Sequence, residues 1–374
     1  MQILYVGIPG STTGDLDAYV SELGVGSRLD MAASGRSAIA AASQSDYDVV
    51  IVGPMQANHS PTDLLEQIRI LRPGAIRIAL VEPEKMDQRS LSRLLGVAHR
   101  FLPLPMSAAQ LLESVHSYEE LRDTVDNPPL RTLVGGIDTL PAPPKLYFSL
   151  MQTLDDEEGS NSSEVASLVG SDPAIAAKVL RLCNSAYFSK GREISDLRSA
   201  VTRLGTTTLR ELVLASEVFS MASPVKVDRQ DLQRRALMAS RLPFKMLPES
   251  SADLGSTAAL LANIGLLLPG VRNEGIAVDA TAAADDRPGH AEAGAYLLGL
   301  WGLPMPIVEA VAFHRAPRKS SLRSFWIPGA VHVAVALACD EPIDEEYLAS
   351  LGVLPRLAGW REQAGRLAEI GFGS

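Results

Sequence analysis

Short apolar runs recur in the first 105 residues and alternate with segments whose apolar residues have helical spacing. The runs are rich in β-branched residues and lie at 3–6 and 49–52, with weaker ones at 78–81 and 101–102. Segments such as 64–71 and 91–95 have the helical spacing. Strands that are apolar on both faces are typical of a parallel sheet covered by helices. The pattern therefore predicts an α/β domain with a parallel sheet and right-handed crossover connections.

Helical spacing alone governs the later part of the chain. Asp172 followed by Pro173 marks a helix start, because an aspartate oxygen can cap the first backbone amides and proline loses no hydrogen bond there. The apolar face of this helix is formed by Ile175, Val179, Leu182 and Cys183. This stretch predicts a packed helical domain.

Two further helices are predicted directly after it. One begins at Ser195 or Asp196 and stops at Gly205, and the next begins at Thr208. Thr208 and Glu211 have the form of a capping box. The pair of helices around Gly205 also imitates a helix-turn-helix over residues 197–215. Leucine and valine fill the would-be recognition helix, however, so it has few groups that can read bases.

A boundary between the two parts is predicted from composition. Residues 119–129 are charged and end in Asn-Pro-Pro, which disfavours continued helix. The prediction is an α/β domain at 1–120, a linker at 121–137 and a helical domain at 138–374. A length of 374 residues suits two domains.

Charge and cysteine content narrow the function classes. The net charge of −10 disfavours nonspecific attraction to nucleic acid or anionic lipid. Cys183 and Cys339 lie in apolar helical patterns, which predicts reduced, buried thiols. The first residues lack the basic flank and long apolar core of a signal peptide. The apolar runs at 260–268 and 331–339 are too short to span a bilayer. We expect a cytoplasmic protein that binds neither nucleic acid nor membrane.

Several separated motifs in the helical part carry a family resemblance. They are LPAPPK, SDPAIAAKVLRLCNSAYF, ISDLRSAVTRLGTTTLRELVL, HAEAGAYLLGLWGLP and FHRAP, in this order. This stretch resembles the HD-related output domain, HDOD. The resemblance implies a helical relative of the HD metal-dependent phosphohydrolases that usually lacks their metal ligands. It also implies an output module of bacterial signalling proteins.

The resemblance places the His-Asp pair of active HD enzymes on Ala262 and Asn263. Such enzymes need converging imidazole and carboxylate ligands to lower the pKa of a metal-bound water. Alanine supplies no ligand, and asparagine supplies only a neutral carbonyl. His290 and His314 remain, and we interpret each as hydrogen bonded in the bundle or exposed at a helix end. His332 lies on an apolar helix face and is interpreted as a satisfied core histidine.

Other residues of the HDOD signature offer a possible partner or pocket surface. They are Asn184, Ser185, His290, Trp301 and His314. A C-cap and turn role explains Asn184 and Ser185 as well, and we favour it. Trp301 is interpreted as an apolar anchor before a turn. The basic run from Arg315 to Arg323 is interpreted as a solvated loop, with an acidic partner or a phosphate-bearing ligand as the alternative.

The α/β part carries a second resemblance, through the phrases DYDVVIVGPM and RFLPLPM. They resemble a response-regulator receiver domain, with a five-stranded flavodoxin-like sheet. The family needs an acidic pair, a phosphoacceptor aspartate, a hydroxyl and a lysine. These positions fall on Gly7, Ile8, Gly53, Glu82 and Leu104. None keeps the required group, so we expect a pseudo-receiver that is not phosphorylated at the usual site.

The leading hypothesis is a noncatalytic bacterial signal-transduction protein. A pseudo-receiver would be coupled to an HDOD output domain that binds other signalling proteins, without a cofactor. A homodimer through the receiver-like domain is also expected, because receiver folds pair through their last helices and strands. The alternative is a divergent metal-dependent phosphohydrolase acting on a nucleotide or cyclic dinucleotide. DNA binding is a third hypothesis, which the apolar recognition helix disfavours.

Overall fold

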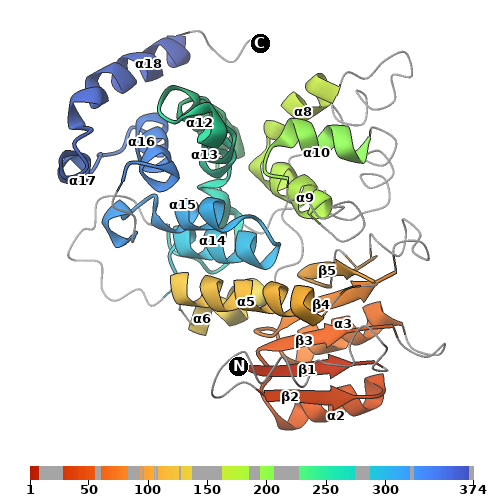
Figure 1. The fold of residues 1–374 in the computed structure, drawn as a ribbon. Coiled ribbons are helices and arrows are strands. Elements are labelled where there is room, and N and C mark those ends of the chain that lie inside the picture. The colour runs from red at the N-terminus through yellow and green to blue at the C-terminus, as the bar shows by residue number, and fades with distance from the viewer. Residues whose placement is uncertain are drawn as a thin grey trace.

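The computed structural model describes most of the chain in separate stretches. These are residues 1–7, 28–54, 60–82, 93–94, 97–104, 106, 108–125, 128–136, 162–184, 194–205, 227–273, 287–320 and 324–369. Figure 1 shows a sheet with helices, formed by the first part of the chain, and a helical bundle formed by the rest. The predicted fold class is confirmed.

Five parallel strands form the sheet. They are β1 (Gln2–Val6), β2 (Arg28–Ala32), β3 (Val49–Val52), β4 (Ile76–Val81) and β5 (Arg100–Pro103). Their order is β2-β1-β3-β4-β5, with Ile3 opposite Val49 and Ile78 opposite Arg100. The four predicted runs became strands, and β2 was missed. β2 lies at the edge and has only one buried residue, so its sequence lacks the apolar run of a central strand.

Three helices accompany the sheet: α2 (Gly35–Gln44), α3 (Pro61–Leu71) and α5 (Ala108–Thr124). Ser34 and Ser60 cap α2 and α3, because each hydroxyl accepts from the amide three residues on. In Figure 1, α5 lies between the sheet and the helical bundle.

The predicted linker is largely helical, which corrects our expectation for residues 119–129. α5 continues to Thr124, and α6 (Pro128–Gly135) follows at once. Proline at the first helical positions starts a helix rather than stopping one. The end of α6 is fixed to the sheet, since Arg77 Nη2 donates to the Gly135 carbonyl at 2.8 Å. His99 Nε2 donates to the same oxygen at 3.2 Å. The positions of the domain boundaries remain a prediction.

The helical part contains ten described α-helices, counting only those from residue 162 onwards in the described stretches. They are α8 (Ser162–Gly170), α9 (Pro173–Cys183), α10 (Leu197–Leu204), α12 (Arg229–Arg241), α13 (Glu249–Leu261), α14 (His290–Leu300), α15 (Met305–Phe313), α16 (Ile327–Cys339), α17 (Glu345–Ser350) and α18 (Leu357–Glu369). Short 3-10 turns lie at η3 (Pro243–Lys245), η4 (Ile264–Leu267), η5 (Pro317–Lys319) and η6 (Leu354–Arg356). Helices α13 to α16 pack on one another and form the core of the bundle.

The predicted helix starts are confirmed where the structure describes them. Asp172 Oδ1 accepts from the amides of Ala174 and Ile175 at 2.7 and 3.0 Å. Asp196 caps α10, and Gly205 ends it with a φ of 74°. The predicted third helix, and with it the would-be recognition helix, lies outside the described residues. Both cysteines are free thiols. Cys183 is buried as predicted, whereas Cys339 is only partly buried, which corrects the prediction for this residue. None of the described helices has the length and hydropathy that a membrane crossing requires.

Candidate functional site

Four helix ends of the bundle meet at the position expected for the degenerate HD pair. Ala262 and Asn263 follow α13, His290 begins α14, and His314 follows α15. The end of α16 joins them, because Asn263 Nδ2 donates to the Cys339 sulfur at 3.7 Å. The structure therefore brings together the HD positions and both histidines of the signature.

Arg315 occupies the middle of this group. Its Nε donates to His314 Nε2 at 3.1 Å, and its Nη2 donates to Asn263 Oδ1 at 3.4 Å. Its Nη1 forms an ion pair with Glu341. The Arg315 side chain is only 10% exposed. We call Asn263, His290, His314, Arg315 and Glu341 the Arg315 centre. The prediction that Arg315 lies in a solvated loop is therefore wrong, since its acidic partner comes from this chain.

Both imidazoles of the Arg315 centre are held neutral. His314 Nδ1 donates to the Val311 carbonyl at 2.7 Å, so Nε2 is the acceptor for Arg315. Burial, followed by the nearby Arg315 charge, holds the His314 pKa well below its usual value. The His290 ring lies edge-on to His314, with ring centroids 5.9 Å apart. Burial, and next Arg315, lowers the His290 pKa to about 3. Neither imidazole carries a proton charge at neutral pH.

His332 is a satisfied core histidine, as predicted. Its Nδ1 donates to the His314 carbonyl at 2.7 Å, and its Nε2 accepts from the Asp344 amide at 2.9 Å. It therefore fixes the backbone of His314 rather than offering a free nitrogen to a ligand.

A divalent metal of the HD type does not fit the groups at this position. Ala262 is fully buried and has no donor atom. Asn263 presents an amide oxygen, and that oxygen already faces the positive guanidinium of Arg315. Among the residues that the structure describes, no three or more His, Cys, Asp and Glu side chains are grouped to hold a metal ion.

The receiver-like sheet shows a different obstruction at its expected phosphorylation site. Gly7 has a φ of 143°, which an aspartate rarely adopts. A Cβ atom on Gly53 would lie 2.6 Å from the hydroxyl oxygen of Tyr5, which is buried in β1. Tyr5 therefore fills the space that a phosphoacceptor side chain would use. Glu82 and Leu104 directly follow β4 and β5 and are partly exposed, and Ile8 lies outside the described residues.

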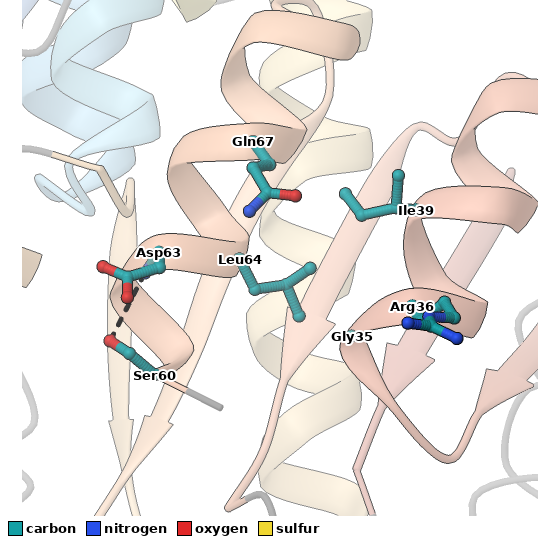
Figure 2. A pocket seen from close by; sticks show the side chains of 7 residues that line it. All are labelled: Gly35, Arg36, Ile39, Ser60, Asp63, Leu64 and Gln67. Carbon is teal, nitrogen blue, oxygen red and sulfur yellow. Dashed lines mark hydrogen bonds between the residues drawn. The ribbon is translucent and has the colours of Figure 1, made fainter. Parts of the chain in front are cut away.

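A surface hollow of about 410 Å³ lies elsewhere on this domain, between α2 and α3. Figure 2 shows Ile39 and Leu64 facing each other between the helices, with Arg36 and Asp63 on opposite sides. Its other lining residues are Gly35, Ser60 and Gln67. Gly7, Gly53, Glu82 and Leu104 do not line it, so it is separate from the expected phosphorylation site.

The remaining signature residues have structural roles. Asn184 Nδ2 donates to the Ile194 carbonyl at 2.9 Å, and Asn184 Oδ1 accepts from the Ile194 amide at 2.8 Å. Asn184 thus joins the two ends of the segment between α9 and α10, which differs from the simple C-cap that we favoured. Ser185 lies outside the described residues. Trp301 is buried after α14, and Gly302 turns the chain with a φ of 79°.

The basic run after His314 is bound by acids of the same chain. Arg318 donates to both carboxylate oxygens of Asp344, at 2.6 and 2.5 Å, and to Glu346 at 2.8 Å. These contacts hold the C-terminal helices near α15. Arg318 is 53% exposed, which agrees with the expected solvated loop, and its acidic partners come from this chain.

The strand order defines the class of the first domain. Order 2-1-3-4-5 with parallel strands is that of the flavodoxin-like, doubly wound fold, which receiver domains also have. The sequence model of the HDOD domain matches residues 140–317. This stretch is an HDOD domain, and it includes the described residues of the Arg315 centre except Glu341.

Comparison with known proteins finds distant relatives. An uncharacterized protein of Treponema pallidum is 24% identical over 201 residues, which are 49% of this chain and 39% of the relative. This chain therefore spans about two fifths of that relative's length. The MmoQ response regulator of Methylococcus capsulatus is a solved structure with 18% identity and a TM-score of 0.45, covering 59% of this chain and 98% of its own. A protein of Shewanella amazonensis, named as a candidate phosphohydrolase, has 24% identity and a TM-score of 0.35, covering 65% and 95%.

Proposed function

We propose that this chain is a noncatalytic signal-transduction protein, in which a receiver-like domain is coupled to an HDOD output domain that binds other signalling proteins. The observation that carries the proposal is the position of Arg315, whose guanidinium contacts His314, Asn263 and Glu341. The division into domains at 1–120 and 138–374 is part of the proposal.

A built-in cation changes the chemistry of the centre. An HD-type hydrolase needs a metal to generate a nucleophilic hydroxide from water. Two of the groups that would be near such a metal, His314 Nε2 and Asn263 Oδ1, here accept hydrogen bonds from a side chain that is itself positive. The hydrogen bonds connect the ends of α13, α15 and α16, so the centre stabilises the bundle instead of binding substrate. No cofactor is required for this role.

Partner binding is the way in which we propose that the two domains act. The receiver-like domain lacks a carboxylate at Gly53 that could accept a phosphoryl group. Its surface is therefore the part that can receive a signal. Pairing of two copies through this domain remains part of the proposal. α5, one of its last elements, packs against α14 and α15 in this chain, so such pairing must use the portion that they leave uncovered.

A divergent phosphohydrolase is the second candidate. It is favoured by two buried histidines that remain in contact, with ring centroids 5.9 Å apart. The two candidates differ in whether the wild-type centre holds a metal, and this can be measured directly.

The test is the metal content of the full chain after growth with added manganese, iron and nickel. Wild type, His290→Ala and His314→Ala are expected to contain equally little metal. The matched gain-of-function variant is Asn263→Asp with Arg315→Ala, which supplies a carboxylate and removes the internal cation. This variant is expected to bind metal more tightly than wild type. Near-stoichiometric metal in wild type that is lost in the histidine variants, together with nucleotide hydrolysis, would overturn the proposal.

A further inference from the structure

Helix α14 extends from the Arg315 centre to the receiver-like domain. Its first residue, His290, lies in the centre. At its other end, the Gly299 carbonyl accepts from Nη2 of Arg100, a β5 residue, at 3.4 Å. Eleven residues of α-helix span about 16 Å. One helix therefore connects the Arg315 centre to the start of β5.

A second arginine makes the opposite contact. Arg181 of α9 donates to the Ala98 carbonyl, just before β5, and its guanidinium lies 5.2 Å from the Trp301 ring centroid. Arg100 in turn lies 4.6 Å from the ring centroid of Tyr118 on α5. Each domain thus extends one arginine to a backbone carbonyl of the other. We call Arg100 and Arg181 the arginine clasp.

Close packing at both ends of α14 leaves little room for movement. A Cβ atom on Gly299 would lie 2.5 Å from Leu121 of α5. A Cβ atom on Gly265, two residues after Asn263, would lie 1.9 Å from the His290 carbonyl oxygen. The backbone of η4 therefore rests directly on the first turn of α14. A shift of α14 must move the segment that carries Asn263, because close-packed interiors transmit displacement.

We propose that α14 couples the receiver-like domain to the Arg315 centre, so that a rearrangement at β5 and α5 is transmitted to Asn263 and its neighbours. Figure 1 shows α5 directly against α14, on the sheet side of the bundle. The proposal deepens the proposed function and rests on it, since it gives a path by which the first domain affects the second. Its test measures side-chain access and no metal, so failure here leaves the noncatalytic assignment untouched.

The chain contains a natural reporter for this coupling. Of its two cysteines, Cys339 contacts Asn263, while Cys183 is fully buried in α9. A Cys183→Ser variant leaves Cys339 as the single thiol, and a Cys339→Ser variant leaves Cys183. Serine can keep the hydrogen bond of Cys183 to the Ala200 carbonyl. Because Cys339 is only partly buried, it has a basal labelling rate with a disulfide reagent such as Ellman's reagent, and an increase above that rate reports opening of the Arg315 centre. The labelling rate of Cys183 reports wider unfolding.

The experiment removes Arg100, one of the two arginines of the clasp, and measures both thiols in the full chain. Arg100→Ala is expected to raise the labelling rate of Cys339 by about fivefold or more, as energetic coupling between sites usually does. The rate of Cys183 should stay unchanged. Arg28→Ala is the matched control, because Arg28 is an exposed arginine on β2, at the far edge of the same sheet. It should change neither rate.

Two outcomes would overturn the coupling. If Cys339 labels at the wild-type rate in Arg100→Ala, the clasp does not influence the centre. If Cys339 and Cys183 accelerate equally, the substitution only destabilises the whole chain. Arg100→Lys provides a milder second variant, since it keeps the charge but loses the planar stacking on Tyr118. It should give an intermediate rate for Cys339 if the coupling holds.

Discussion

The positions expected for a phosphorylation site in the receiver-like sheet and for a metal site in the HDOD domain are filled in different ways. In the receiver-like sheet the obstruction lies in the backbone and in a buried ring: Gly7 has a φ of 143°, and Tyr5 fills the space beside Gly53. In the HDOD domain the polar side chains of His314 and Asn263 are present, and Arg315 donates a hydrogen bond to each of them. An aspartate cannot be restored at Gly7 without strain, whereas the Arg315 centre differs from a metal site by side chains alone.

The two regions therefore differ in the kind of interaction that stabilises them. At the expected site of the sheet, Tyr5 packs against Gly53, so this region contributes through van der Waals contact. The polar side chains of the Arg315 centre bond to one another, so the centre contributes through hydrogen bonds and charge. Substitutions in the two regions should therefore lower the free energy of unfolding by different physical mechanisms. The three predictions below separate these mechanisms.

The largest effect is expected at the Arg315 centre. Arg315→Ala leaves the Glu341 carboxylate and the Asn263 carbonyl without their donor in a largely buried position. Losing one partner of a buried charged pair is strongly destabilising, and we expect a loss of about 3 kcal/mol in the free energy of unfolding. Urea denaturation followed by tryptophan fluorescence measures it.

Arg318→Ala is the control for this substitution. Arg318 also pairs with carboxylates, but its side chain is 53% exposed, so its removal should cost much less. Equal losses in the two variants would show that Arg315 acts as an ordinary surface ion pair and would contradict the role given to the centre.

A smaller, purely steric effect is expected in the sheet. Gly53→Ala places a methyl group 2.6 Å from the Tyr5 hydroxyl and should destabilise the chain by about 2 kcal/mol through overpacking. In a Tyr5→Phe background the nearest ring atom is Cζ at 3.3 Å, so most of the penalty should disappear. A double-mutant cycle by urea denaturation measures this coupling. Additive losses would mean that Tyr5 does not fill the position.

The sequence predicted the elements whose signals are local. Asp172 and Asp196 were correctly identified as helix caps, because capping depends on neighbouring amides alone. β2 was missed because an edge strand needs no apolar run. α6 was taken for a linker, since the prolines that begin it also fit a boundary. Local signals cannot distinguish a linker from a helix, or an edge strand from a loop, when the packing partners lie far along the chain.

The centre itself was predicted only in part. The positions of Ala262, Asn263, His290 and His314 followed from the HDOD resemblance. Arg315 was missed because its partners, Asn263 and Glu341, lie 52 and 26 positions away in sequence. The sequence did contain one signal for Arg315. It directly follows His314, so its positive charge must lie close to that histidine. The role of Tyr5 left no sequence signal, since a tyrosine in a buried strand is ordinary.

The smallest predicted effect is a pH dependence that belongs to the Arg315 centre and not to the sheet. His290 has a pKa of about 3 in the folded chain, against an ordinary value of about 6.5. Between these values the unfolded chain binds one more proton at this residue, so its contribution to stability is present above pH 6.5 and is lost as the pH falls. The expected slope is about 1.4 kcal/mol per pH unit.

His290→Gln removes this titration, so the stability gap between wild type and variant should narrow by that slope as the pH falls from 6.5 to 5. Urea denaturation at several pH values measures the gap. Gly53→Ala exchanges no ionisable group, and its gap to wild type should stay constant over the same range. A constant gap for His290→Gln as well would mean that this imidazole has the same pKa in the folded and the unfolded chain. That outcome would contradict the conclusion that His290 is held neutral by burial and by the positive charge of Arg315. The contrast between a charged centre in the HDOD domain and a purely steric site in the sheet depends on this conclusion.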